Sequence, residues 1–355
     1  MKKVWASFLL ILGLLFTGCA NNNQVVSENS NEKIEDKETI YASFYPIYNL
    51  TKQIVGDKFE VKSFTNLNTE VHDFEPSAKD MKDLSSAKVL FLNGAGLESW
   101  QDKVKDSVDI DMIDTSEGVD LIKTDHDNDH EDYEHGDHSH EDHKHENHEY
   151  RDHDHEDHEH GDHIYEDHNH EDKEGHHYHH HGLYDPHIWL SPKNGIIQAR
   201  NIKDKLVEID PENENYYNKN FEKIQKELEE IDKTYQDKLE NLPSRKFIVD
   251  HEAFSYLARD YKLEQIPLTS ISSTGEVDAK TMKKAVDFVN NQGIGAIFYE
   301  KGGSNKNVQV LADELDLKAQ ALDTIEYANE GDIENKVTYQ SIVEKNLETI
   351  ESSLK

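Results

Sequence analysis

Residues 89–94 read Val-Leu-Phe-Leu-Asn-Gly, four apolar residues followed by two that favour a turn. A short apolar run that ends in turn residues is typical of a strand buried on both faces of a parallel sheet. Residues 247–251 in the second half, Phe-Ile-Val-Asp-His, have a similar form. Each half of the chain is therefore predicted to contain a parallel sheet.

Strands and helices are expected to alternate around these two runs. Apolar alternation or short apolar runs predict further strands at 40–44, 59–65, 110–113, 265–268, 295–299 and 319–322. Helical spacing of apolar residues predicts helices at 47–55, 77–87, 97–107, 252–261, 278–291, 305–315 and 336–354. This alternation predicts an α/β fold with two lobes, each a parallel sheet flanked by helices.

The segment that joins the two predicted lobes, residues 191–242, has a different pattern. Its apolar residues recur at helical spacing among many lysines and glutamates, and Pro211 interrupts the run after Asp210. Because proline is tolerated at the start of a helix but not in its interior, we expect two helical pieces. Together they form a long rigid linker helix between an N-terminal lobe at 39–190 and a C-terminal lobe at 243–355.

Residues 125–182 are too polar to contribute to either core. Twenty of the 23 histidines lie in this stretch, beside many aspartates and glutamates and few apolar residues. It is predicted to be a disordered loop, since it has little to bury. Imidazole and carboxylate groups bind transition metals, so the loop is expected to hold further Zn²⁺ ions weakly. The candidate ligands of this auxiliary site are His126, His130, His135, His138, His140, His176, His177, His179, His180 and His181. Repeat expansion of a solvated segment is an alternative that does not exclude metal binding.

The charge of the chain excludes one class of partner. The net charge is −36, and the residues outside 125–182 still carry −17. A nucleic acid requires a basic surface to neutralise its phosphates, so it is not expected as a partner. The same negative field attracts cations.

The N-terminus has the features of a secretion signal. Lys2 and Lys3 precede an apolar run at 4–16, which is too short to span a bilayer comfortably. Gly18 then precedes Cys19, the single cysteine of the chain, in an arrangement that resembles a bacterial lipobox. We therefore expect a signal peptide at 1–18 and a lipidated flexible tether at 19–38. The protein would be a monomer anchored by lipid at the extracellular face of the cell membrane. A retained anchor, or a simple secretory signal with an incidental cysteine, are the alternatives.

Three histidines stand apart from the loop, and each lies beside a predicted strand or helix: His72, His187 and His251. Zinc prefers about four ligands in a tetrahedron and binds imidazole readily. Ligands of open parallel sheets bind beyond the carboxyl ends of the strands, where His251 and Glu300 are placed. We expect these residues to meet in a cleft between the lobes. A structural, hydrogen-bonded role is the alternative for any one of these histidines taken alone.

Four motifs strengthen this interpretation: VHDFEPS (71–77), DPHIWLSP (185–192), VDHEAFSYLA (249–258) and IFYEKGGSNKNVQVLADE (297–314). In this order they resemble the metal-specific solute-binding lipoproteins of ABC importers, solute-binding protein family 9, over residues 39–355. The zinc members, which carry a His-rich acidic loop, are the most similar. The resemblance implies two lobes joined by a rigid helix, with the metal between them and an ABC permease as partner. It assigns the three histidine ligands to His72, His187 and His251.

The resemblance leaves the fourth ligand open between a carboxylate of the second lobe and a water molecule. Glu300 is the candidate carboxylate. Manganese members carry an acidic residue in place of His251 and an aspartate near the position of Ser304-Asn305. Both departures favour zinc, as does the general preference of manganese for oxygen-rich sites.

The expected function is therefore zinc binding and not catalysis. The chain contains no H-E-x-x-H motif, and a catalytic zinc requires an open coordination position and a general base. We predict an extracellular zinc-binding lipoprotein that delivers Zn²⁺ to an ABC permease for high-affinity uptake. A manganese-specific homologue, a metallohydrolase, and a zinc-sequestering or adhesin-like surface protein remain the alternatives.

Deletion of residues 125–182 distinguishes a lipoprotein that delivers Zn²⁺ to a permease from a zinc-sequestering or adhesin-like surface protein. One tight zinc site is expected to remain, because His72, His187 and His251 lie outside the deletion. Titration calorimetry on the shortened chain measures the number of sites and their affinity. Loss of all tight binding would favour a sequestering protein in which the repeat is the active part.

Overall fold

The computed structural model describes residues 37–67, 71–124, 183–269, 294–303, 305–328 and 330–355, together with Lys283 and Val286. The predicted signal peptide, Cys19, the His-rich loop and most of the helix expected at 278–291 lie outside the described residues. Residues 37–355 form one compact unit.

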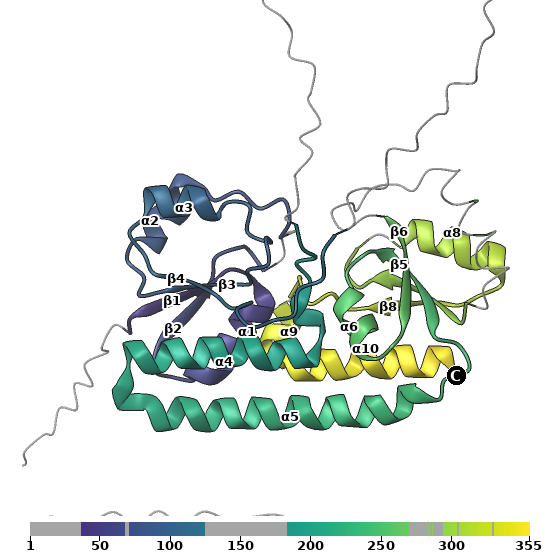
Figure 1. The fold of residues 1–355 in the computed structure, drawn as a ribbon. Coiled ribbons are helices and arrows are strands. Elements are labelled where there is room, and N and C mark those ends of the chain that lie inside the picture. Colours follow the sequence, from purple (N-terminus) through teal and green to yellow (C-terminus); the bar gives the residue numbers. More distant parts are fainter. Residues whose placement is uncertain are drawn as a thin grey trace, which may run out of the picture. The chain divides into compact units, whose positions relative to one another are not determined.

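The N-terminal lobe is built on a parallel sheet of four strands in the order β2-β1-β3-β4 (Figure 1). The strands are β1 (Thr39–Ala42), β2 (Glu60–Ser63), β3 (Leu90–Leu92) and β4 (Met112–Asp114). The helices that connect them are α1 (Tyr45–Val55), α2 (Ala78–Leu84) and α3 (Gln101–Ser107). A capping box starts α2, in which Ser77 and Asp80 each accept a hydrogen bond from the other's backbone N–H.

The C-terminal lobe has the same strand order in its own parallel sheet, β6-β5-β7-β8. Its strands are β5 (Lys246–His251), β6 (Glu264–Thr269), β7 (Ala296–Glu300) and β8 (Ala319–Leu322). The described helices that follow them are α6 (Ser255–Asp260), α8 (Lys306–Leu315), α9 (Glu330–Glu334) and α10 (Tyr339–Leu354). The predicted α/β fold with two parallel sheets is confirmed, although the short helix α9 was not predicted.

Both faces of the first sheet are covered, as the apolar run at 89–92 predicts. Val89 and Phe91 belong to the same apolar cluster as α1 and α4, whereas Leu90 and Leu92 pack with residues of α2 and α3. Because successive side chains of a strand point to opposite faces, an unbroken apolar run is what two covered faces require. The second sheet repeats this division, with Val249 on one face and Ile248 on the other.

The linker at 191–242 consists of two helical pieces, as the interruption at Pro211 predicts, but the pieces do not form the one long linker helix that was expected. It is a pair of antiparallel helices, α4 (Pro192–Ile209) and α5 (Glu214–Glu240), joined by a short 3₁₀ turn at Pro211–Asn213 (Figure 1). Pro211 cannot continue the hydrogen bonding of α4, and the chain turns there. The Asp210 side chain accepts hydrogen bonds from Asn213 and Tyr217, which stabilises the turn. The two helical pieces therefore pack on each other instead of following one axis.

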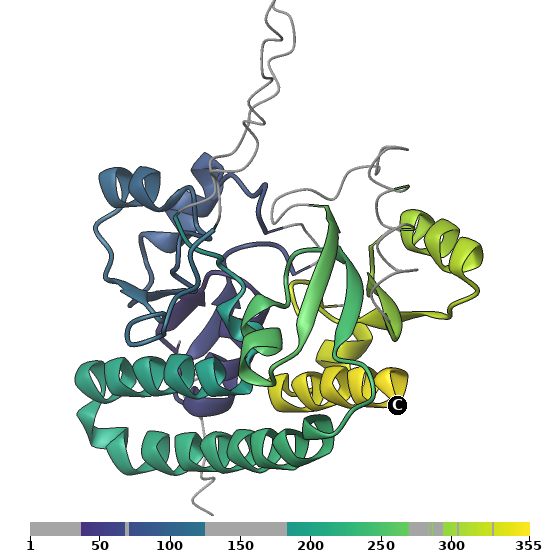
Figure 2. The ribbon, with the colours of Figure 1, turned by 45° about the vertical axis from the view of Figure 1, so that its right-hand side comes forward.

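A single apolar cluster runs through both lobes and through α4, α5 and α10. Trp189 lies within it, packed edge-on against Phe44 of the N-terminal lobe, and its indole N–H donates to the Thr324 carbonyl of the C-terminal lobe. Figure 2 shows α10 beside α5, as Figure 1 does from another side. Tyr339 at the start of α10 donates a hydrogen bond to the Trp189 carbonyl. The lobes are thus parts of one folded body.

The contact between Tyr339 of α10 and the first turns of α4 depends on a glycine. A Cβ atom at Gly195 would lie 2.4 Å from the hydroxyl oxygen of Tyr339 and under 3.0 Å from two of its ring carbons. Tyr339 is fully buried, so its ring has little space into which to move.

Among the described residues, no helix has the length and apolar character needed to cross a membrane.

Replacing Gly195 by alanine tests this contact. Alanine usually stabilises a helix interior by about 1 kcal/mol relative to glycine. Here we expect the opposite sign, a loss of about 1–3 kcal/mol, because the new methyl group overpacks against Tyr339. Urea unfolding of Gly195→Ala against wild type measures the difference. Gly303→Ala is the control, since its Cβ would make only ordinary contacts. A stabilised Gly195→Ala variant would contradict the close packing.

Candidate metal centre

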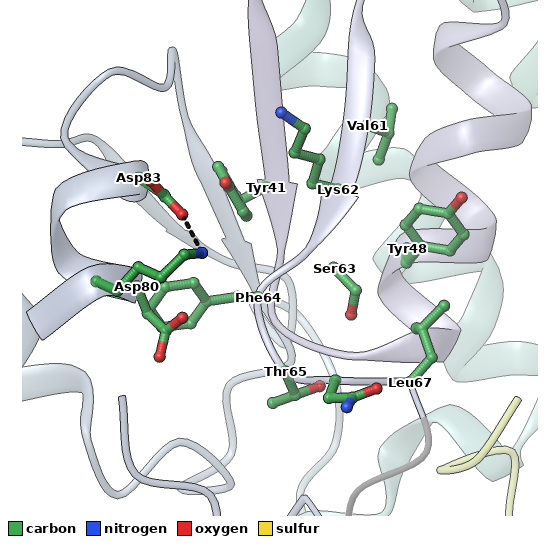
Figure 3. Close-up of a pocket in the computed structure, with 12 residues that line it drawn as sticks. Tyr41, Tyr48, Val61, Lys62, Ser63, Phe64, Thr65, Leu67, Asp80 and Asp83 are labelled. Carbon is green, nitrogen blue, oxygen red and sulfur yellow. Dashed lines mark hydrogen bonds and ion pairs between the residues drawn. The ribbon is translucent and has the colours of Figure 1, made fainter. Parts of the chain in front are cut away.

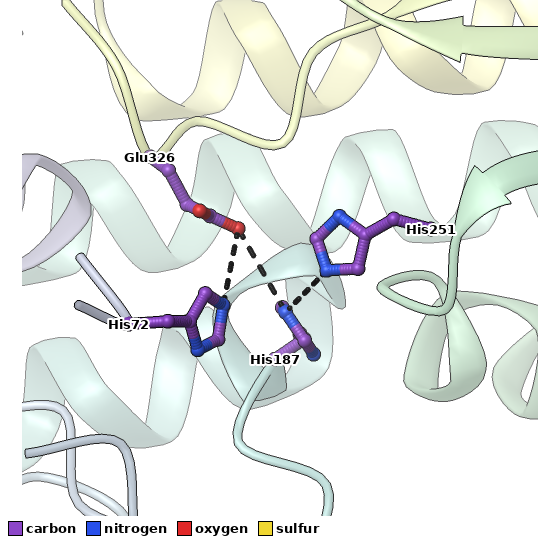
Figure 4. Close-up of side chains that lie close together, drawn as sticks. All are labelled: His72, His187, His251 and Glu326. Atoms are coloured by element: carbon purple, nitrogen blue, oxygen red, sulfur yellow. Dashed lines mark hydrogen bonds and ion pairs between the residues drawn. The ribbon is translucent and has the colours of Figure 1, made fainter. Parts of the chain in front are cut away.

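Three histidines and a glutamate meet between the two lobes (Figure 4). His72 lies in the loop after β2, His187 precedes the linker helices, His251 is the last residue of β5, and Glu326 lies in the loop after β8. One ligand atom of each lies within 4.8 Å of the others, and all four residues are buried. The structure therefore brings together the three histidines that the sequence singled out.

The distances between these atoms suit a tetrahedral ion. The Nε2 atoms of His187 and His251 are 3.1 Å apart, and Glu326 Oε1 lies 3.7 Å from Nε2 of His187 and 3.9 Å from Nε2 of His72. Ligand atoms around tetrahedral zinc are about 3.3 Å apart when each lies at the usual bond length. Three imidazoles and one carboxylate are also a donor set that zinc accepts, so residues and ion fit one another.

His187 is held by Asp185 so that its Nε2 atom faces the centre. Asp185 Oδ1 accepts hydrogen bonds from Nδ1 of His187 at 2.8 Å and from the backbone N–H of His187 at 2.9 Å. With the proton on Nδ1, Nε2 presents a lone pair, which is how outer carboxylates prepare metal-binding histidines. Burial raises the pKa of Asp185, but the His187 imidazole outweighs it and the pKa lies below the usual value. Burial lowers the pKa of His187 despite the opposing effect of Asp185, which keeps the ring neutral and able to bind metal.

Glu300, the carboxylate expected as the fourth ligand, lies on the other side of His251. Its Oε2 atom is 3.6 Å from Nδ1 of His251, whereas Nε2 of His251 faces His187. Thr324 donates a hydrogen bond to Oε1 of Glu300. Burial raises the pKa of Glu300, but the opposing effect of His251 and Thr324 is larger. The pKa therefore lies below the usual value of a glutamate, and the carboxylate stays ionised. Glu300 therefore lies on the Nδ1 side of His251, as Asp185 does for His187, but at 3.6 Å it makes an ion-pair contact and not a hydrogen bond.

Sequence reasoning missed Glu326, the carboxylate that lies among the histidines. Glu326 comes four residues after the end of β8. The only sequence feature that could have indicated it is its place near the carboxyl end of a parallel strand, a feature that it shares with Glu300 at the end of β7. Its loop is set by tertiary contacts: the Thr324 carbonyl accepts from the Trp189 indole, and the Ala328 N–H donates to the Leu67 carbonyl. Ile325 has a φ of +63°, which is rare for a β-branched residue and costs on the order of 1–3 kcal/mol.

A separate hollow of about 430 Å³ lies on the N-terminal lobe (Figure 3). Tyr41, Tyr48 and Phe64 contribute to its lining, but none of the four residues of the metal centre does. Of its carboxylates, Asp83 pairs with Lys79 at 2.8 Å. This hollow therefore shares no residue with the candidate metal centre, and at least one of its carboxylates is already paired with a lysine.

Two α/β lobes with parallel sheets, and a buried histidine-carboxylate centre to which both contribute, define a metal-binding solute-binding protein. The chain belongs to the family described as "Zinc-uptake complex component A periplasmic", which matches residues 40–353. The family prediction made from the sequence is thereby confirmed, and zinc rather than manganese is the metal named in its description.

The chain is also similar to individual proteins of this kind. It is 29% identical to the high-affinity zinc uptake system protein ZnuA of Bacillus subtilis, over 100% of this chain and 99% of that protein. It is 32% identical to the zinc-binding protein AdcA of Streptococcus pyogenes, over 89% of this chain but 56% of AdcA. Among solved structures, the metal-dependent lipoprotein YcdH of Bacillus subtilis is similar with a TM-score of 0.67 and 26% identity, over 90% of this chain and 100% of YcdH.

The role of Asp185 is open to a direct test. In Asp185→Asn, the amide is neutral and its NH₂ group competes to donate to Nδ1, which moves the imidazole proton towards Nε2. We expect zinc affinity to fall by about 10–100-fold, the usual cost of losing such a partner. Competition with a chromophoric chelator measures the affinity, and circular dichroism of the metal-free variant serves as the folding control. Unchanged affinity in a folded variant would exclude Asp185 as the residue that orients His187.

Proposed function

We propose that this protein captures Zn²⁺ outside the cell and delivers it to the permease of an ABC importer. The convergence of His72, His187, His251 and Glu326 within 4.8 Å in a buried site is the observation on which the proposal depends. Membership of the zinc-uptake family supports the transport role.

The proposed ligands are His72, His187, His251 and Glu326, and the proposed role of Glu300 is to orient His251. This assignment replaces the expectation that Glu300 binds the ion. A buried ion needs nearby opposite charge, because desolvation of an uncompensated charge is costly. The carboxylates of Glu326, Asp185 and Glu300 together carry one negative charge more than Zn²⁺ needs for neutrality, whereas the three imidazoles bind as neutral groups.

The same ligand count supports binding over catalysis. Catalytic zinc sites have three protein ligands and keep one position for water or substrate. With three imidazoles and one carboxylate, all four tetrahedral positions are taken by side chains. The centre is also buried, which suits retention of an ion more than access by a peptide or ester substrate.

Anchoring by lipid at Cys19 remains part of the proposal. A secreted capture protein has to stay near its permease, and a lipidated cysteine followed by a polar tether would hold it at the membrane surface. The similar protein YcdH is described as a lipoprotein. We infer a monomer on the extracellular face, with residues 125–182 as an auxiliary site of weaker affinity.

Substitutions at the two glutamates and at His187 test the ligand set in a chain without residues 125–182. His187→Ala is expected to abolish tight binding. Glu300→Gln is expected to lower the zinc affinity by about 10–100-fold, the usual cost of losing an outer partner. Glu326→Gln should lower the affinity more, because it removes a ligand. Titration calorimetry with zinc and a competing chelator gives the affinities. If Glu300→Gln is the more severe change, Glu300 and not Glu326 is the ligand.

A further inference from the structure

A buried polar network in the N-terminal lobe reaches the segment that carries His187. Asn93, which directly follows β3, is fully buried. Its Nδ2 atom donates hydrogen bonds to the carbonyl oxygens of Gly94 and Pro186, both at 2.9 Å. Its Oδ1 atom accepts a hydrogen bond of 3.0 Å from Gln198 of α4. Both ends of the Asn93 amide are therefore engaged, and its orientation is determined by its partners.

The Pro186 carbonyl is the centre of the turn that presents His187. It accepts a hydrogen bond of 2.8 Å from the Ile188 N–H as well as the one from Asn93. His187, between Pro186 and Ile188, has φ −77° and ψ +40°, close to an inverse γ-turn. Asp185 holds the imidazole ring, whereas Asn93 holds the peptide from which the side chain of His187 projects.

Asn93 is itself held firmly. The backbone N–H groups of Asn93 and Gly94 donate to the two carboxylate oxygens of Glu98, at 2.7 and 3.0 Å. Gly94 has a φ of +81°, and a Cβ atom there would lie 1.7 Å from Oδ1 of Asp114, so only glycine fits this turn. Buried hydrogen bonds of this kind make a segment rigid, so the place of the Asn93 amide is fixed relative to the Pro186 carbonyl.

We propose that Asn93 is a positioning residue of the zinc site, which acts on His187 through the Pro186 carbonyl. The inference rests on the proposed function, because it requires that His187 bind the ion. Removal of the Asn93 amide leaves the Pro186 carbonyl with one of its two donors and frees the peptide before His187 to rotate. The Nε2 atom of His187 then no longer has a fixed place opposite His251 and Glu326.

The test uses Asn93→Ala in the chain without residues 125–182. Zinc affinity is expected to fall about tenfold, at the lower end of the cost of losing an outer partner of a metal ligand. The visible absorption bands of the Co²⁺-loaded protein should also shift, because they report the geometry of the ligands. A change that only loosens the fold would lower the unfolding temperature and leave these bands in place.

Asn201→Ala is the matched control. The Asn201 amide also donates to two backbone carbonyls, those of Thr115 and Glu117, from the same helix as Gln198. It has no hydrogen bond to the His187 segment among the described contacts, so affinity and Co²⁺ bands should match wild type. If Asn93→Ala fails to fold, Asn93→Ser replaces it, since a serine hydroxyl is too short to reach Pro186.

The outcomes separate this inference from the proposed function. If wild type binds zinc tightly and the Asn93 variants keep wild-type affinity and Co²⁺ bands, the positioning role is wrong and the function stands. If wild type itself binds no zinc, the proposed function fails first. Lower affinity with shifted bands in the Asn93 variants alone supports the inference.

Discussion

The central constraint on this structure is the burial of three imidazoles and a carboxylate at one point. With Nδ1 of His187 donating to Asp185, its Nε2 lone pair points toward Nε2 of His251 only 3.1 Å away. The Glu326 carboxylate is buried beside these two nitrogen atoms, and a negative charge in a medium of low dielectric constant is costly without a compensating positive charge. A divalent cation supplies that charge and is attracted by the carboxylate and by the imidazole nitrogens alike. The charges and hydrogen bonds around the site are arranged for that cation.

The fold provides this point through the ends of its strands. In both sheets the chain forms a strand on one side of the first strand and then crosses to the other side. Such a switch leaves a crevice beyond the carboxyl ends, in which His251 of β5 and Glu300 of β7 are placed. The second lobe supplies His251 and Glu326, and the first supplies His72 and, through the network around Asn93, the position of His187. The site therefore requires both sheets.

Much of this arrangement could be predicted from the chain, because the responsible signals are local. Apolar runs and alternation located the strands, and the isolation of His72, His187 and His251 from the repeat marked the histidines. Glu326 could not be distinguished from Glu300 in this way. Both follow strands, and the choice between them depends on the course of the loop after β8, on the unusual φ of Ile325 and on contacts with Trp189. These are tertiary effects, which no spacing rule contains.

The common strand order of the two sheets suggests two equivalent halves, yet their packing makes them inseparable. Phe44 and Phe298, one from each half, belong to the same apolar cluster, which also includes Leu228 and Ile231 of α5. A fragment cut after the linker helices would expose these apolar faces to water and would be prone to self-association. Loss of either half would leave the other with uncovered apolar surface, so each sheet depends on the other half of the chain for its covering layer.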